Sequence, residues 1–276
     1  MKEKIALYNF HSHTSRCGHA FGKDEEYIAN AIKEGFPYFG MSDHVIFPFL
    51  DQPKIRGNYN KDFPSYIQSF KYLKRQYSNQ IDLHLGMEAE YSNLLKSYYI
   101  DLLKNELEYL ILGQHFHMNN DLVFHNYDRY SNPGELYVKD LIEGMESGLF
   151  LYVAHPDQLI YYQENNEEFK VLSKRIIEAS KRTKTPLEFN YSKVAILEQN
   201  GEIDAQEKAI FPVKEFWEIA ALEGADVIIG LDTHDPKYVT KDNFLKAYKY
   251  ATEFHLKILA PEEIINRMRI IKKQNL

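Results

Sequence analysis

The feature that most constrains this fold is an alternation of short apolar segments with segments of helical period, repeated along the chain. Seven apolar segments have the length and composition of β-strands: residues 6–10, 38–44, 81–91, 109–116, 151–157, 186–190 and 226–234. Helical periodicity occurs at residues 24–34, 63–77, 94–105, 134–147, 168–183, 212–223, 241–254 and 261–273. Repeated β/α units of this kind predict a parallel sheet covered by helices, the α/β class.

The units are predicted to form one domain that spans residues 1–276. The chain has 44% hydrophobic residues, and no linker rich in glycine, serine or proline interrupts the alternation. The pattern alone leaves open whether the sheet is open or closed. Seven or eight successive units in one chain favour closure, because α/β barrels of about 250 residues are common.

The charge balance limits the possible partners. Lysine and arginine total 33 against 40 aspartates and glutamates, which gives a net charge of −7. The sequence has no basic tract that could neutralise a run of nucleic-acid phosphates. No apolar run approaches the roughly 20 residues that cross a bilayer. The single cysteine, Cys17, forms no internal disulfide. We therefore expect a cytoplasmic protein that binds a small molecule rather than nucleic acid or a membrane, and its oligomeric state stays open.

Histidines and carboxylates gather at the carboxyl ends of six of the seven predicted strands. The candidate metal ligands are His11, His13, His19, His44, Glu88, His115, His155, Asp232 and His234. In a parallel barrel these strand ends lie on one face, where active sites are built. One histidine alone is as readily a buried polar residue as a ligand, but nine such residues at strand ends predict a shared metal site.

The spacing of these residues also indicates metal binding. His11 and His13 are two residues apart, so on a strand their imidazoles point to the same face, about 6 to 7 Å apart along the chain. Asp232 and His234 repeat that spacing. A catalytic zinc ion usually takes three protein ligands, so nine ligands imply two or three ions. Imidazole and carboxylate ligands suit zinc, iron or manganese, and clustered ions of this kind promote hydrolysis.

Three neighbouring residues have other interpretations. His117 follows the fourth-strand ligand by one strand step, and it either contacts substrate or lies in a solvated loop. His84 shares a predicted strand with Glu88 but lies four residues earlier, deeper in the barrel, and we expect it to be structural. Cys17 lies between two candidate histidines, where we expect a neutral thiol rather than a thiolate ligand.

Six motifs occur in a fixed order between residues 11 and 234: HSHTSRCGHA, SDH, GMEAEY, GQHF, AHPD and GLDTH. This series resembles that of the polymerase and histidinol phosphatase (PHP) superfamily. The resemblance implies a distorted (β/α)7 barrel, which is a TIM-like fold, with a site for three metal ions, two of which are bridged by Glu88. It also implies three ligand sets: His11, His13, Glu88 and Asp232; His19, His44 and His234; and Glu88, His115 and His155.

Within the superfamily, the chain length and the segments CGHA, GMEAEY and LEFN resemble the stand-alone histidinol-phosphate phosphatases. These enzymes hydrolyse L-histidinol phosphate to L-histidinol and phosphate in histidine biosynthesis. Their LEFN segment often continues to an arginine that binds the phosphate, whereas this chain has Lys193. Lys193 is therefore the first candidate for the phosphate contact, Arg16 and Arg129 are the others, and His117 is a further candidate for contacting substrate.

The implied reaction is attack of a metal-bound hydroxide on phosphorus, with Glu88 and Asp232 acting through the ions that they hold. The leaving alkoxide needs a proton, which either Asp43 or His234 supplies. Two alternatives stay open: a phosphoesterase that acts on nucleotides or another small phosphate ester, and a metal-binding module without catalysis. Phosphate release from L-histidinol phosphate, compared with a nucleotide and an aryl phosphate, separates the three.

Overall fold

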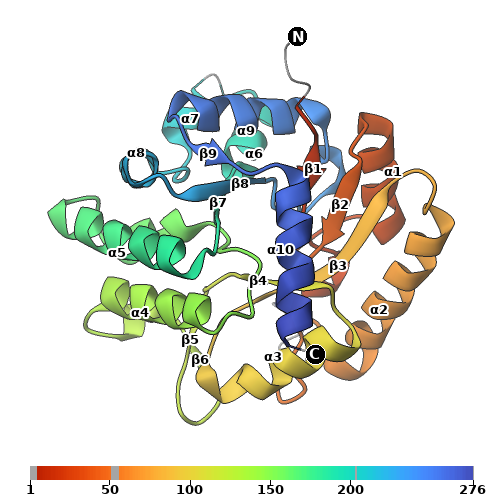
Figure 1. Ribbon diagram of the computed structural model, residues 1–276, viewed down its shortest axis with the longest axis horizontal. Helices are drawn as coiled ribbons and strands as arrows, with labels where there is room; N and C mark the ends of the chain where they lie inside the picture. The colour runs from red at the N-terminus through yellow and green to blue at the C-terminus, as the bar shows by residue number, and fades with distance from the viewer. Residues whose placement is uncertain (1–4, 51–55, 203, 276) are drawn as a thin grey trace.

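The computed structural model describes residues 5–50, 56–202 and 204–275, and it has the predicted α/β organisation (Figure 1). A four-stranded parallel sheet contains, in spatial order, β1 (Tyr8–Asn9), β2 (Tyr38–Met41), β3 (Asp82–Ala89) and β4 (Tyr109–Leu112). A three-stranded parallel sheet contains β7 (Leu187–Asn190), β8 (Asp226–Gly230) and β9 (Lys257–Ile258). Strand order follows chain order in both sheets, as successive β/α units require.

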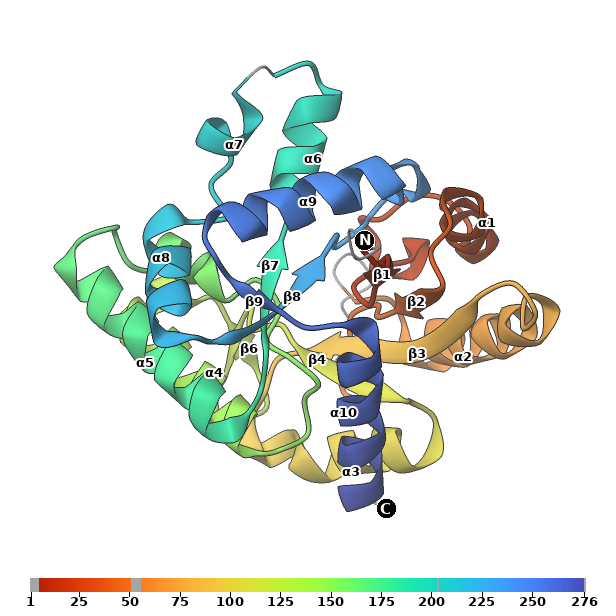
Figure 2. The same cartoon turned by 45° about the horizontal axis from the view of Figure 1, so that its top comes forward.

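Isolated parallel bridges join the two sheets. Val153 pairs with Leu112 at the end of β4 and with Leu187 at the start of β7. On the other side Ser12 pairs with Thr233, whose carbonyl oxygen accepts from the backbone N–H of residue 13 at 2.9 Å. The result is a curled parallel sheet, around which the helices lie (Figure 2).

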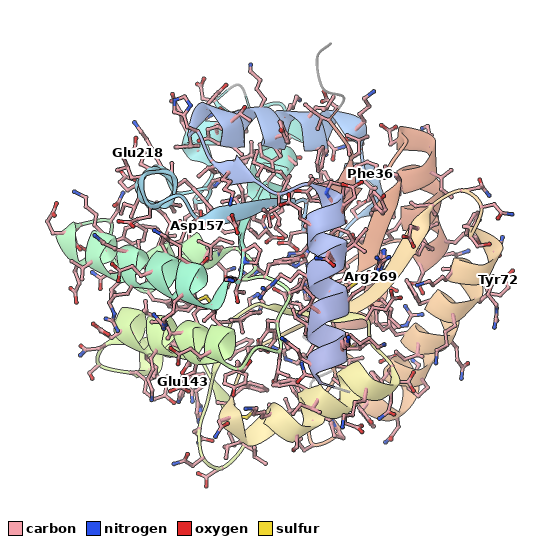
Figure 3. The ribbon with its side chains drawn as sticks, viewed as in Figure 1. Phe36, Tyr72, Glu143, Asp157, Glu218 and Arg269 are labelled. Carbon is pink, nitrogen blue, oxygen red and sulfur yellow. The ribbon has the colours of Figure 1, made fainter. Side chains whose placement is uncertain are left out.

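The helices of the outer layer are α1 (Asp24–Glu34), α2 (Tyr59–Gln76), α3 (Lys96–Asn105), α4 (Pro133–Glu146), α5 (Glu167–Thr183), α6 (Ser192–Gln199), α7 (Ala205–Lys208), α8 (Lys214–Glu223), α9 (Lys241–Glu253) and α10 (Pro261–Gln274). Tyr72 on α2, Glu143 on α4 and Glu218 on α8 are exposed and point outwards (Figure 3). Helices α6 and α7 project beyond the other helices (Figure 2). A short antiparallel hairpin, β5 (His117–Met118) with β6 (Phe124–His125), precedes α4.

Tyr109 packs inside the curled sheet, and its side chain occupies the space that a Cβ atom would need at two glycine positions. Its hydroxyl donates to the carbonyl oxygen of Phe10 at 2.8 Å. A Cβ atom at Gly40 or at Gly86 would overlap the Tyr109 side chain. Because close-packed interiors tolerate little extra volume, both positions keep hydrogen in place of a side chain. The buried apolar side chains form one cluster that extends through both sheets and the helices.

Most predicted segments are confirmed, and their ends differ for local reasons. Helix α1 has the predicted bounds, whereas α2 begins four residues early because the side chain of Asn58 accepts from the backbone N–H of Lys61 and caps it. The strand expected at 151–157 contributes only the bridge at Val153. It stops there because His155 has a left-handed backbone and a proline follows.

Among the α-helices and strands of the described residues, five were not predicted: β5 and β6 of the hairpin, α6, α7 and β9. The apolar residues of α6 do not gather on one face, so the segment has no helical signal in its hydrophobic pattern. The strands of the hairpin and β9 each have two residues, too few for an alternating pattern. Within the described ranges, every helix is too short or too polar to cross a membrane.

Candidate metal centre

All nine candidate ligands lie at or beyond the carboxyl ends of parallel strands, as predicted. They come from β3 itself, from the segments that follow β1, β2, β4 and β8, and from the turn after the Val153 bridge. The fold therefore brings together residues that are more than two hundred positions apart in the sequence, such as His11 and Asp232.

Glu88 lies in the middle of this cluster and is 1% exposed. The shortest distances from its carboxylate oxygens to histidine nitrogens are 3.5 Å for His11, 3.4 Å for His13, 3.2 Å for His44, 3.5 Å for His115 and 2.9 Å for His155. Oε2 faces the first three histidines, and Oε1 faces the last two. The two oxygens thus have different neighbours, which is the arrangement that a carboxylate between two cations needs.

Two further groups of ligand atoms lie around Glu88. Oδ1 of Asp232 is 3.4 Å from Nε2 of His11 and 3.3 Å from Nε2 of His13, and these three residues have ligand atoms within 4.8 Å of one another. A second group with that spacing consists of His19, His44 and His234. The structure therefore brings together the members of each ligand set that the family resemblance implies.

Backbone conformation and a glycine make room for these side chains. Gly113 directly follows β4, and a Cβ atom there would overlap the carboxylate of Glu88. His155 and Asp232 have φ values of 32° and 42°, in the left-handed region that residues with a side chain rarely adopt. Such strain costs on the order of 1–3 kcal/mol and concentrates at functional sites. Both residues are candidate ligands, so the strain coincides with the cluster.

Burial and charge act in opposite directions on the central groups. Burial raises the pKa of Glu88, but the surrounding imidazoles, that of His115 first, lower it well below its ordinary value. The same balance, in which the His11 imidazole has the largest lowering effect, lowers the pKa of Asp232 well below its ordinary value. Burial lowers the pKa of His11, but Glu188 and Asp232 raise it well above its ordinary value. The carboxylates are therefore ionised, and they stabilise positive charge in the cluster.

His44 and His234 are neutral, and a neutral imidazole is the form that binds a metal. Burial lowers the pKa of His44 well below its ordinary value, and burial together with the charge of His13 lowers the pKa of His234 to about 3. Cys17 lies close to His13 and His234, but burial raises the pKa of its thiol to about 12. The neutral thiol is the state that the sequence predicted.

The donor atoms fit divalent transition-metal ions. Buried polar atoms are normally hydrogen-bonded. Within the described ranges, four buried atoms of this cluster have no hydrogen-bond partner: Nδ1 of His13, Nδ1 of His44, Nδ1 of His155 and Oδ1 of Asp232. Nε2 of His11 and Nε2 of His13 face each other at 3.1 Å. Imidazole and carboxylate donors left unsatisfied at such spacing suit zinc, iron or manganese.

The cluster opens into a cavity of about 530 Å³, a size typical of small-molecule sites. Besides candidate ligands, its wall includes Phe21, Arg56, Phe116, Lys193, Phe211 and Tyr238. Lys193 belongs to α6, directly after β7, and its Nζ lies 5.9 Å from the ring centroid of Phe211. Of the four residues predicted to contact substrate, Lys193 is therefore the one that the structure places in the cavity wall.

Arg16, Arg129 and His117 do not line this cavity. Each has its polar atoms engaged elsewhere: Nη1 of Arg16 with Asp24 at 2.8 Å, Nη1 of Arg129 with His125 at 3.1 Å, and Nδ1 of His117 with Asp140 at 2.7 Å. Sequence position near the strand ends suggested these residues, but the direction of a side chain in a loop depends on its local partners.

Asp43 and His84 also lie away from the cavity. Asp43 is 2% exposed, accepts from the hydroxyl of Thr14, and has Oδ1 3.6 Å from Nδ1 of His13. It therefore lies behind a candidate ligand and does not line the cavity, whereas His234 does. His84 lies outside the cluster, with Nδ1 2.9 Å from Oε2 of Glu108, in agreement with the structural role expected of it.

Sequence reasoning missed a layer of polar residues behind the ligands. It assigned no metal-site role to the strand at 186–190, yet Oε1 of Glu188 accepts from Nδ1 of His11 at 2.7 Å. Glu90 pairs with buried Arg56, and its Oε1 lies 3.3 Å from Nδ1 of His115. The available signal was a carboxylate on the interior of an apolar strand, because a buried charge requires a partner.

Comparisons with known proteins show which family the chain resembles. The model of the PHP domain family matches residues 9–192, about two thirds of the chain. A protein of Schizosaccharomyces pombe named "Probable histidinol-phosphatase" is 25% identical over an alignment of 260 residues that covers 83% of this chain and 81% of that protein. One of the same name from Deinococcus radiodurans is 28% identical over an alignment of 165 residues that covers 55% of this chain and 60% of that protein.

A solved structure shares the fold. It is histidinol phosphate phosphatase from Lactococcus lactis, complexed with zinc, L-histidinol and phosphate. The structural alignment covers 93% of this chain and 97% of that protein's chain. The TM-score is 0.68 at 15% sequence identity, so this likeness supports the fold. The family match includes six of the strand-end histidines and Glu88, and on that basis the chain belongs to the PHP domain family.

Proposed function

We propose that this chain is a metal-dependent phosphomonoesterase that hydrolyses L-histidinol phosphate to L-histidinol and phosphate. The observation that carries the proposal is Glu88 buried among five histidines at the floor of a cavity of about 530 Å³. Membership of the PHP family and the names of the two relatives support the substrate. A cytoplasmic location, in keeping with the single cysteine, belongs to the same proposal.

We further propose that residues 1–276 form one domain with a distorted, closed (β/α)7 barrel. The bridges of Val153 with its two neighbours, and of Ser12 with Thr233, support a continuous ring of seven parallel strands. The single apolar cluster supports one domain. In a closed barrel the carboxyl ends of all the strands surround one mouth, which accounts for ligands from six strands.

The proposed ligand sets are His11, His13, Glu88 and Asp232; His19, His44 and His234; and Glu88, His115 and His155. When bound, divalent ions at these sets supply a water nucleophile at neutral pH and neutralise charge on the phosphoryl group. The chain's own residues hold the reacting groups in place. The apolar cavity wall excludes water from the organic part of the substrate, because Phe21, Phe116 and Phe211 line it.

Lys193 is proposed to bind the phosphate, since its ammonium group belongs to the same cavity as the ligands. The proton for the leaving oxygen is proposed to come through water on the side of the cavity that His234 lines, because the neutral His234 imidazole is not itself an acid. Asp43 instead lies behind the His13 ring, where its charge faces Nδ1 at 3.6 Å, and it is buried there. The arrangement suits a small phosphate monoester: one anionic end at the cluster and one organic end against aromatic side chains.

The function is tested by phosphate release from three substrates at equal concentration. With zinc or manganese supplied, L-histidinol phosphate should be hydrolysed at least about tenfold more efficiently, in kcat/KM, than a nucleoside monophosphate or an aryl phosphate, a difference of about 1.4 kcal/mol in transition-state binding. A preference for the nucleotide would replace the proposed substrate. No release from any ester by the metal-loaded protein would leave a binding module.

The metal content follows from the number of ligands. We expect two to three transition-metal ions per chain, because nine convergent ligands exceed what one tetrahedral or octahedral centre takes. Elemental analysis of protein saturated with metal and then desalted measures this number. Prolonged chelation should abolish activity, and manganese, iron or zinc should restore it. One ion or none per chain would exclude the three proposed ligand sets.

Glu88→Gln is expected to be the most damaging conservative substitution. A neutral amide does not compensate two cations, so the rate should fall at least about a thousandfold, roughly 4 kcal/mol. His84→Gln is the matched control, because His84 also lies on β3 but contacts Glu108 outside the cluster. Steady-state kinetics and metal analysis on the same samples decide. Equal loss in a folded, metal-loaded His84→Gln variant would contradict the ligand assignment.

Lys193→Ala should raise KM for L-histidinol phosphate about ten- to a hundredfold, equivalent to about 1.4–2.8 kcal/mol of lost phosphate binding. Lys193→Arg should keep most of the activity, since a guanidinium also binds phosphate oxygens. Neither variant should change the metal content, because Lys193 is not a ligand. An unchanged KM in the alanine variant would show that another basic residue binds the phosphate.

A further inference from the structure

We propose that Glu188 is a positioning residue that aligns candidate ligands from three strand ends, an inference that rests on the proposed metal-dependent function. Glu188 lies in the middle of β7 and is fully buried. It does not enter any of the proposed ligand sets. Its carboxylate instead accepts three hydrogen bonds, and each of them reaches a different part of the centre.

The first hydrogen bond fixes the ring of His11. Oε1 of Glu188 lies 2.7 Å from Nδ1 of His11, and neither side chain is exposed to solvent. With Nδ1 directed at Glu188, the other nitrogen, Nε2, is the one that faces Glu88 and Asp232 and would bind an ion. A carboxylate behind an imidazole in this way sets its tautomer and orientation and strengthens it as a metal ligand.

The other two hydrogen bonds involve Oε2. It accepts from the backbone N–H of His155 at 3.0 Å, which holds that residue in its left-handed conformation. It also accepts from the side-chain amide of Asn190 at 2.9 Å, and the same amide group donates to Oδ2 of Asp232 at 3.2 Å. One carboxylate therefore connects the ends of β1 and β8 with the turn that carries His155.

The chemistry of these three bonds requires glutamate. All three partners are N–H donors directed at the two oxygens of Glu188. A carboxylate has acceptor sites for all of them, whereas glutamine would turn an N–H₂ group towards at least one of these donors. Aspartate keeps the charge and the acceptors but is shorter by one methylene group, so it cannot reach all three partners at once.

Gly230 gives independent evidence that the place of this carboxylate matters. Gly230 ends β8 and pairs with Asn190 of β7, and a Cβ atom there would overlap the Glu188 carboxylate. The backbone of Gly230 has no positive φ that would itself require glycine. Glycine at this position thus leaves space for the Glu188 carboxylate, as Gly113 does for the carboxylate of Glu88.

The test is zinc binding by the metal-free protein, followed by calorimetry. Glu188→Gln should weaken at least one class of zinc sites about ten- to a hundredfold, the usual effect of losing a partner behind a ligand. Glu223→Gln is the matched control, because Glu223 lies at the end of α8 in an ion pair with Lys181. It should leave zinc affinity unchanged. A residue with a merely structural role would lower the unfolding midpoint of the metal-free protein and leave zinc affinity intact, which would overturn the proposal.

Gly230→Ala provides a second route to the same carboxylate. It should also weaken zinc binding, and the double variant with Glu188→Gln should lose little more than the worse single variant, since both act on one group. Additive losses would contradict the proposal. If Glu188→Gln does not fold by circular dichroism, Glu188→Asp and Gly230→Ala are titrated instead, with unchanged zinc affinity as the opposing result.

These titrations contain no substrate, so they separate the inference from the proposed function. A parent protein that binds zinc but does not hydrolyse L-histidinol phosphate would refute the proposed activity, and the zinc affinities of the variants would still decide the role of Glu188.

Discussion

The structure depends on one buried negative charge, the carboxylate of Glu88. An ionised carboxylate in a protein interior is strongly destabilising unless opposite charge surrounds it. Five histidines lie within 3.5 Å of it, and it is 1% exposed. The cluster also contains unpaired ring nitrogens and a second ionised carboxylate, Asp232, so it favours bound cations.

The curled sheet is what makes this concentration of polar groups possible. The region around Tyr109 is apolar and close-packed, and two glycines leave room for its ring. This packing holds the strands in place away from the candidate ligands. At the carboxyl ends the strands stop, and short segments carry ligands inward. Strain at His155 and Asp232 is retained there because the surrounding packing and the hydrogen bonds of Glu188 hold the backbone.

The sequence predicted the α/β class, most strands and helices, and the convergence of nine candidate ligands, because strand ends in parallel units share one face. It did not predict the layer behind the ligands. The role of Glu188 was overlooked. The hydrophobic pattern predicts a strand at 186–190, but it does not show which donors on neighbouring strands need a buried hydrogen-bond acceptor. The spacing also did not show that Arg16 and Arg129 lie outside the cavity wall, because loop side chains follow local partners such as Asp24 and His125.

The most direct test of a metal cluster centred on Glu88 is a crystal structure of the metal-loaded protein, with anomalous diffraction recorded on both sides of the zinc or manganese absorption edge. The account predicts two or three anomalous peaks, at least two of them within about 2.0–2.2 Å of an oxygen of Glu88, the distance of a carboxylate ligand to zinc. It also predicts Glu188 behind His11 and not bound to any ion. A single peak remote from Glu88, or no peak in a protein soaked with metal, would contradict it.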